Sequence, residues 1–416
     1  MKFGTFYQQQ MPRPWDDGEE VKSFSNHIEQ AVLADELGFH SVWVTEHHFL
    51  EEYSHSSAPE IFLGAVAART KRIRLAHGIR HTPPGIKHPA RVAEEIATLD
   101  VISNGRVEFG VGEGATRLEL GAHYIAGREK RAMSLEASEQ IANMLAMSPY
   151  PGWDGEYFKM ECRNIVPKPV QRPHPPMWLA CTNRETIALA GRLGIGALAF
   201  SFVDPTESAH WVETYYNAIK SDECVPIGHA VNPRIAMVSG LSIDDDRATA
   251  IRDGYDCFNF FKFSLNATLM RDSVPGYTNL WADYVAEQAD NGGCDMAIAE
   301  ALAQGDAYTG ASGTVEDVRR RMRLFENSGI DEVIFTIQGG RRPHAHICQT
   351  LTRFAGEVMP EFQARDAARR AQLDAELAPY IEAALKRKKW MKALDRHEVP
   401  VVEGIRKNIS ATVSQL

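Results

Sequence analysis

Two adjacent histidines in the segment Thr45-Glu46-His47-His48 are the side chains of this sequence best suited to chemistry. An imidazole titrates at about pH 6.5, so it can take up and release protons at neutral pH. Neighbouring side chains on an extended segment point in opposite directions, so at most one ring should face a cavity. Glu46 could orient one of the rings. No HxH, HExxH or carboxylate at ligand spacing accompanies the pair, so we expect no metal ion.

Two other segments could bring their backbone close to a ligand. The glycine-rich run Gly110–Gly114 would let a planar ring or an anion approach, but it lacks GxGxxG spacing and could equally be a plain turn. Thr182 and Asn183 are typical N-cap residues, and the free N–H groups at a helix start bind phosphate. Capping alone explains them equally well. Cys181, beside them, is better explained as a small buried residue than as a nucleophile.

A regular alternation of β-rich and amphipathic segments must position these residues. We predict strands at 2–7, 41–44, 73–79, 106–111, 177–180, 196–200, 234–239 and 333–337. We predict helices at 19–37, 59–70, 89–102, 128–147, 184–193, 207–220, from 244–246 onward, 314–327 and 344–358. Strict alternation indicates parallel strands joined by crossovers, and the eight units suit a closed (β/α)8 TIM barrel better than an open sheet.

Polar side chains follow most of the predicted strands, which is where a barrel carries its active site. The strand ends are Tyr7-Gln8-Gln9, Thr45-Glu46-His47-His48, Arg80-His81-Thr82, Gly112-Glu113-Gly114, Cys181-Thr182-Asn183, Ser201-Phe202 and Gln338-Gly339-Gly340. This position favours a functional role for the histidine pair. Trp43, inside the second strand, is better explained by barrel packing.

Bulk composition narrows the class of protein. The formal net charge of −10 argues against nucleic acid or an anionic membrane as the main partner. The six cysteines form no CxxC pair, and no signal peptide or spanning apolar run is evident, so we expect a cytoplasmic protein. We expect a barrel over residues 1–362, with insertions at about 148–176 and 258–312, the second irregular and partly helical. A helical tail over 363–416 would be a solvated face or an oligomer contact.

Several separated segments together resemble the bacterial luciferase-like flavin monooxygenases. They are Met1–Phe6, Leu37–Phe49, His88–Arg91, Leu99-Asp100, Gly105–Gly110, Gly313-Thr314 and Val358–Phe362. The resemblance covers about residues 1–362 and is specific for the family but not for a substrate. It implies a (β/α)8 barrel with insertions, in agreement with the alternation described above.

The resemblance also implies a cofactor and a reaction. Most members with the Glu-His-His segment use reduced FMN (FMNH2), which a separate NAD(P)H:flavin reductase supplies. O2 adds at the flavin C4a position, and the peroxyflavin delivers one oxygen atom. We therefore expect a two-component flavin-dependent monooxygenase, homodimeric as the family favours, acting on a small organic molecule.

The resemblance assigns roles around the histidine pair. His47 would be the catalytic residue, a general base or hydrogen-bond donor near the peroxyflavin. Arg80-His81 falls where the family carries a non-prolyl cis peptide beneath the isoalloxazine. The side chains expected to line the flavin or substrate pocket are Tyr7, Thr45, His48, Phe49 and His81.

The expected flavin site contains two departures from luciferase, at Gly112 and Glu113. Thr182 and Asn183 fall in the segment that contacts the FMN phosphate. Gly112 stands where luciferase carries a reactive cysteine, which would leave space near C4a. Glu113 stands where luciferase carries a phosphate-binding arginine and would repel a phosphate, so Arg117, Arg184 or another donor would have to replace it.

Two other functions fit the same barrel. One is a hydride-transferring oxidoreductase that depends on the deazaflavin F420 and does not consume oxygen. The other is a non-catalytic flavin-binding partner subunit, against which the intact histidine pair counts.

Overall fold

The computed structural model describes residues 1–200, 205–290 and 310–404. Eight parallel strands form the barrel: β1 (Lys2–Tyr7), β2 (Ser41–Val44), β3 (Arg74–His77), β5 (Val107–Gly112), β8 (Met177–Cys181), β9 (Gly196–Ala199), β10 (Ile235–Ile243) and β12 (Glu332–Thr336). They pair in chain order, and β12 returns to β1 with Glu332 opposite Lys2. The predicted (β/α)8 barrel is confirmed. The predicted strand end Ser201-Phe202 lies outside the described residues.

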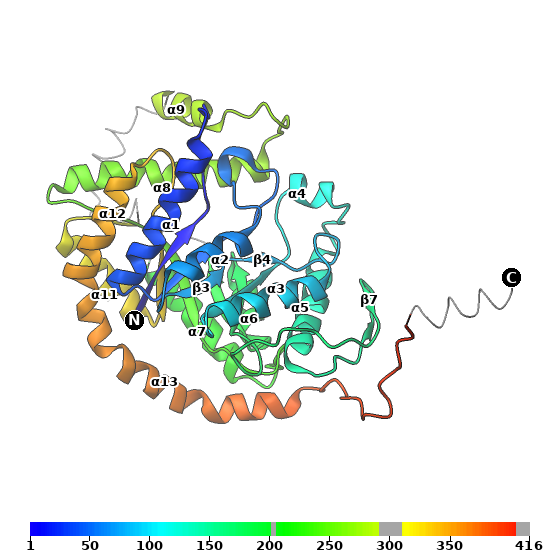
Figure 1. The fold of residues 1–416 in the computed structure, drawn as a ribbon. Coiled ribbons are helices and arrows are strands. Elements are labelled where there is room, and N and C mark those ends of the chain that lie inside the picture. The colour runs from blue at the N-terminus through cyan, green and yellow to red at the C-terminus, as the bar shows by residue number, and fades with distance from the viewer. Residues whose placement is uncertain (201–204, 291–309, 405–416) are drawn as a thin grey trace, which may run out of the picture.

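Helices surround the barrel and follow its strands (Figure 1). They are α1 (Glu19–Leu37), α2 (Pro59–Arg69), α3 (Pro89–Ile102), α5 (Lys130–Ala146), α6 (Arg184–Arg192), α7 (Pro205–Lys220), α8 (Arg247–Met270), α11 (Val315–Ser328) and α12 (His344–Arg353). Local signals set their ends. Asn183 and Thr314 form capping boxes at the starts of α6 and α11. Gly38 and Gly329 take the left-handed conformation that ends α1 and α11.

Short elements fill the connections between these units. They are η1 (Glu51–Tyr53), β4 (Arg80–His81), α4 (Arg117–Ala122), the hairpin of β6 (Trp153–Asp154) and β7 (Lys159–Met160), α9 (Leu280–Asp290) and β11 (Ala311–Gly313). The segment from residue 258 onward is more regular than we predicted. α8 continues to Met270, because its aromatic residues recur at helical spacing and Phe258 and Phe261 are buried.

The C-terminal region continues the last helix of the barrel. A π-helical turn (Phe354–Val358) leads into α13 (Met359–Arg387), which runs without interruption across residue 362. Figure 1 shows α13 passing along the lower side of the barrel. Leu377 and Ala384 are buried, and Arg234 forms an ion pair with Asp374. One face of this helix is therefore part of the packed structure.

Strand alternation divides the apolar side chains into two cores. Inside the barrel, Phe6 packs with Trp43 and Trp178, and the two indole rings meet edge to face at 5.2 Å. This confirms barrel packing for Trp43. The larger core lies between the strands and the helices and contains Val42 and Val44, the neighbours of Trp43.

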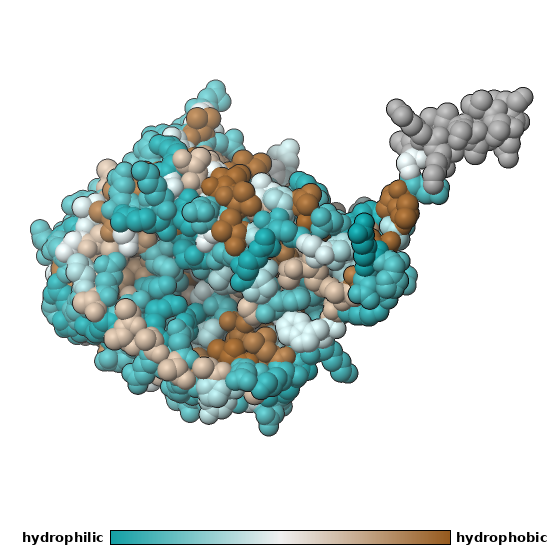
Figure 2. Space-filling model, turned by 60° about the horizontal axis from the view of Figure 1, so that its bottom comes forward, coloured by the Kyte–Doolittle hydropathy of each residue, from teal (hydrophilic) through white to brown (hydrophobic). Residues whose placement is uncertain are grey.

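Figure 2 shows an outer surface that is mostly hydrophilic with small separate hydrophobic patches. No helix in the described part of the chain is long and apolar enough to cross a bilayer.

Two buried histidines should make the fold sensitive to mild acid. Burial lowers the pKa of His27 to about 3 and that of His77 to about 4. In the unfolded chain a histidine has a pKa of about 6.5, so below that pH the unfolded state binds protons that the folded state does not. The free energy of unfolding is therefore highest above pH 6.5 and falls as the pH drops toward 4. We expect a loss of about 2 kcal/mol per histidine at pH 5 in urea unfolding. His27→Gln should reduce this pH dependence, and an unchanged dependence would contradict the assignment.

Candidate active site

A cavity of about 290 Å³ opens at the carboxyl ends of the barrel strands, where barrel enzymes place their sites. Apolar side chains form most of its wall, including Phe6, Ile79, Leu179, Phe200, Phe261 and Leu265. A smaller polar set converges on it from several strand ends, including Gln8, Thr45, His47, Tyr53, His81 and Thr182. An apolar wall with few polar groups is typical of a pocket for a small organic molecule or cofactor.

The two neighbouring histidines face different surroundings. His47 lines the cavity, and its Nδ1 lies 2.9 Å from Glu119 Oε1. His48 lies outside the cavity lining, and its Nε2 lies 3.0 Å from Glu46 Oε1. Because Nδ1 of His47 is held by Glu119, Nε2 is the ring atom left for a molecule in the cavity. This is the divergence expected of adjacent side chains on an extended segment.

Glu119 is a residue of the candidate site that sequence reasoning missed. It lies on the short helix α4, where Thr116 caps the helix and donates a hydrogen bond of 2.8 Å to Glu119 Oε2. Burial raises the pKa of Glu119, but the charge on His47 and the hydrogen bond with it outweigh burial and bring the pKa to about 2. An anionic carboxylate at Nδ1 keeps a proton on that nitrogen and fixes the ring orientation. The pattern Thr116-x-x-Glu119 could have revealed a helix start, but not its contact with His47.

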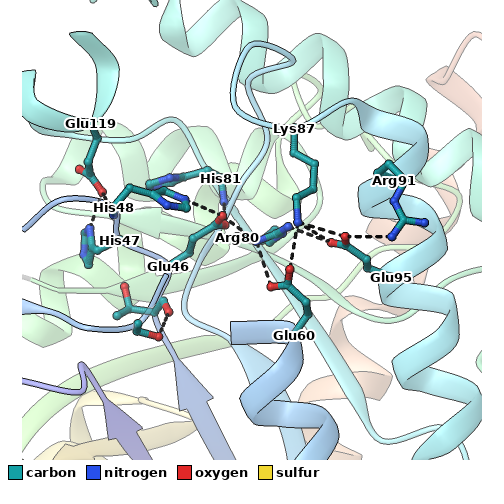
Figure 3. A network of polar contacts seen from close by, with 12 residues as sticks. Glu46, His47, His48, Glu60, Arg80, His81, Lys87, Arg91, Glu95 and Glu119 are labelled. Atoms are coloured by element: carbon teal, nitrogen blue, oxygen red, sulfur yellow. Dashed lines mark hydrogen bonds and ion pairs between the residues drawn. The ribbon is translucent and has the colours of Figure 1, made fainter. Parts of the chain in front are cut away.

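Glu46 joins the histidine pair to a buried ionic network behind the cavity (Figure 3). Its Oε2 accepts the backbone N–H of His81 at 2.7 Å, and its Oε1 lies 2.6 Å from Arg80 Nη1. Burial raises the pKa of Glu46, but the hydrogen bond from His48 and the charge of Arg80 lower it to about 2. Arg80 continues the network to Glu95 at 2.8 Å. The network therefore holds both strand ends that carry the histidines.

His81 is the second imidazole on the cavity wall. It lies on β4 and is 1% exposed, and burial lowers its pKa to about 4, so the ring is neutral at neutral pH. Its ring centre lies 6.1 Å from that of His47. Its Nδ1 is buried and has no hydrogen-bond partner among the described residues.

One end of the cavity carries two cationic side chains. Lys130 and Arg131, at the start of α5, line it together with Thr182 and Thr186 from the start of α6. Glu113 lies between the two cations, with Lys130 Nζ at 3.3 Å and Arg131 Nε at 3.0 Å. Arg131 Nη1 also lies 3.7 Å from the exposed carboxylate of Glu185, so two carboxylates stand against the two cations. The helix starts add N–H donors for an anion.

Comparison with known proteins decides the family. A family model described as luciferase-like monooxygenase matches residues 1–332. The chain belongs to the luciferase-like monooxygenase family. The resemblance found in the sequence motifs is thereby confirmed.

Relatives within the luciferase-like family include both flavin and F420 enzymes. The oxygenase component of a flavin-dependent trigonelline monooxygenase from Acinetobacter baylyi is 24% identical, over 87% of this chain and 96% of its own length. An F420-dependent glucose-6-phosphate dehydrogenase from Amycolatopsis mediterranei is 33% identical, over 42% of this chain and 53% of its own length. The chain likewise spans about half the length of other curated relatives that it matches. The crystal structure of the monooxygenase RslO1 from Streptomyces bottropensis, 26% identical, has a TM-score of 0.68, covering 87% of this chain and 100% of that one.

Three of the predicted pocket residues lie elsewhere in this luciferase-like barrel. Tyr7 packs on the outer face of β1 against His27, with ring centres 5.5 Å apart, because alternation turns Phe6 and Gln8 inward instead. Phe49 is 56% exposed and lines an adjoining groove. His48 is turned toward Glu46. Thr45 lies on the cavity wall, as predicted.

The predicted cofactor contacts are also divided. His81, Gly112 and Thr182 line the cavity, whereas Arg80 lies behind it in the ionic network. The side chain of Asn183 accepts the Thr186 N–H at 2.9 Å as a helix cap and stays outside the lining. The non-prolyl cis peptide joins Gly78 to Ile79, two residues before the predicted place, in the break between β3 and β4.

The predicted replacements for the phosphate-binding arginine also lie away from the cavity. Arg117 is not among its lining residues, and Arg184 is paired with Glu207 at 2.7 Å. The cations at the cavity are instead Lys130 and Arg131. Cys181, as expected, is a small buried residue, and burial raises the pKa of its thiol to about 12.

Gly112 should be intolerant of a side chain. A methyl group there would lie 2.3 Å from Ile79 Cδ1 and 2.5 Å from its Cγ1, so Ile79 would be pushed toward the cavity. We expect Gly112→Ala to lose about 1–3 kcal/mol of unfolding free energy. The second change Ile79→Ala should restore part of it. Gly64→Ala is the matched control, since nothing lies within 4 Å of its added carbon. Equal unfolding midpoints for the two glycine variants would contradict this packing.

Proposed function

We propose that this protein is a flavin-dependent monooxygenase that uses reduced FMN and O2 to oxygenate a small, uncharged organic molecule. The observation that carries the proposal is the placement of His47. Anionic Glu119 holds its Nδ1, and its Nε2 is left to an apolar cavity that has Lys130 and Arg131 at one end. The trigonelline monooxygenase relative, which aligns over nearly its whole length, supports this reaction class.

The residues of the cavity fit a reduced flavin mononucleotide. Lys130 and Arg131 would hold the phosphate, together with the hydroxyl of Thr182 and the start of α6. The apolar walls beside Gly112 and Ile79 suit a planar isoalloxazine. Bound in this way, reduced flavin supplies the two electrons that activate O2.

The chain itself would supply proton transfer and a dry environment. His47 would donate or accept a proton at Nε2, and Glu119 would stabilise the imidazolium form through Nδ1. The neutral ring of His81 adds a hydrogen-bonding group on the same wall. Phe6, Phe200 and Phe261 would exclude bulk water from the reacting atoms. Of the two oxygen atoms, one would enter the product and the other would leave as water.

The source of reduced flavin follows from the same proposal. The trigonelline relative is an oxygenase component by name, so its reductant comes from another component. We expect a separate NAD(P)H:flavin reductase to supply this protein too, and a homodimer in the cytoplasm is our expectation for its working form.

Dependence on F420 is the second candidate, because several F420-dependent dehydrogenases are among the relatives. Anaerobic titrations of the full chain with FMNH2 and with reduced F420 would separate the two. We expect micromolar or tighter binding of FMNH2, and consumption of O2 when air is admitted. Tight binding of F420 with no binding of FMNH2 would overturn the monooxygenase proposal. Binding of neither cofactor would favour a non-catalytic subunit.

A further inference from the structure

Three potential metal ligands converge at the rim of the cavity from three different elements. His47 follows β2, His81 lies on β4 and Glu119 lies on α4, and one ligand atom from each lies within 4.8 Å of the other two. Metal–ligand bonds of about 2.0–2.2 Å place donor atoms about 3–3.5 Å apart. The pair His47 Nδ1 and Glu119 Oε1, at 2.9 Å, already has nearly this separation. Sequence spacing gave no sign of this arrangement, because the ligands come together only in space.

His81 is the observation that points to a ligand. Its side chain is 1% exposed, and its Nδ1 is buried without a hydrogen-bond partner among the described residues. A buried ring nitrogen without a partner loses the hydrogen bond that water would provide, so it is rarely left in that state. A ring nitrogen of His81 is nevertheless directed to within 4.8 Å of the other two ligand atoms.

A second trio, Glu46 with His48 and His81, meets the same distance criterion but is less suitable. Both oxygens of Glu46 are already used, one by Arg80 at 2.6 Å and the other by the backbone of His81. A cation at this carboxylate would be repelled by the buried guanidinium. Glu119, in contrast, has only neutral hydrogen-bond partners besides His47 among the described residues, namely the Thr116 hydroxyl and the His48 backbone N–H.

We propose that His47, His81 and Glu119 bind a divalent first-row transition-metal ion of the Zn²⁺ class, which blocks the site. Two imidazoles and a carboxylate are a common donor set for such ions. The ion would replace the contact between His47 and Glu119 and hold the ring that would otherwise transfer the proton. The cavity would leave a coordination position open to a small molecule.

The test uses the full-length chain, treated with a chelator and studied without any flavin. Calorimetry with Zn²⁺ should give one site, and Co²⁺ should give an absorption spectrum typical of nitrogen and oxygen ligands. His81→Ala and Glu119→Gln should each weaken the binding of Zn²⁺. The loss should exceed the roughly 10–100-fold that follows when a residue that only supports the ligands is removed. His48→Ala is the matched control and should change the affinity little.

Several outcomes would overturn the proposal. They are the absence of a stoichiometric site, equal Zn²⁺ affinities in wild type and His81→Ala, or a larger loss in His48→Ala than in His81→Ala. Circular dichroism and urea unfolding of each variant would exclude misfolding. Glu119→Gln is nearly isosteric with the wild type, so it tests the site even if His81→Ala does not fold. Because no flavin is present, the result is independent of the proposed monooxygenase activity. A positive result predicts that Zn²⁺ inhibits flavin-dependent turnover and that a chelator restores it.

Discussion

Replacement of His47 by alanine should lower turnover by about 10²–10⁴-fold, the usual contribution of a positioned acid or base. His47 is the histidine whose free ring nitrogen is left to the cavity, whereas its Nδ1 is held by Glu119 at 2.9 Å. The binding of reduced FMN should change little, because the proposed phosphate contacts lie at Lys130 and Arg131. The measurements are kcat with a neutral organic substrate found by screening the wild type, and the fraction of O2 released as hydrogen peroxide. That fraction should rise in the variant.

Two further variants make this result specific. His48→Ala removes an imidazole from the same segment, but one that contacts Glu46 rather than the cavity, so it should lower kcat much less. Glu119→Gln keeps the shape of the side chain and removes its charge, so it should give an intermediate loss of kcat at nearly unchanged KM. Normal turnover in His47→Ala, with normal coupling of O2 use to product, would show that the proton is transferred elsewhere.

Local patterns were sufficient to predict the barrel and one side of the site. Strand and helix periods and caps such as Thr314 and Gly329 predicted the elements with errors of one or two residues at most boundaries. The position of His47 at the end of β2 follows from the same argument. The strand end predicts Tyr7 in the pocket, but in the barrel Phe6 and Gln8 face inward and alternation turns Tyr7 outward.

The rest of the site depends on contacts between residues far apart in the chain. Glu119 meets His47 across 72 residues, through a helix of only six residues that has no apolar periodicity to reveal it. Lys130 and Arg131 reach the cavity from the start of α5, where the sequence shows only two ordinary cations at a helix start. The sequence predicts that Glu113 repels a phosphate, because its contacts with Lys130 and Arg131 arise only in the folded chain. Tertiary placement, rather than residue type, decides these roles.

Replacement of Arg80 by methionine should lower the free energy of unfolding by about 3–5 kcal/mol, the usual effect of removing one partner from a buried ion pair. Arg80 and Glu46 are both 1% exposed, and Arg80 also lies 2.8 Å from Glu95. Without the guanidinium, Glu46 would be a buried charge without its cationic partner, and burial would favour its protonation. Urea unfolding at pH 7.5 would measure the change. Lys87→Met, a partly exposed member of the same network, should lose only about 0–1 kcal/mol.

A double variant separates the loss of the charge pair from the loss of packing. If the unpaired carboxylate causes most of the lost stability, adding Glu46→Gln to Arg80→Met should restore part of it. Glu46→Gln alone should be destabilising. Additive losses in the two single variants would instead mean that each side chain acts independently. The network also reaches the active site, because Glu46 holds the backbone of His81 and the ring of His48. Arg80→Met should therefore reduce turnover in the folded fraction as well, without any contact between Arg80 and the cavity.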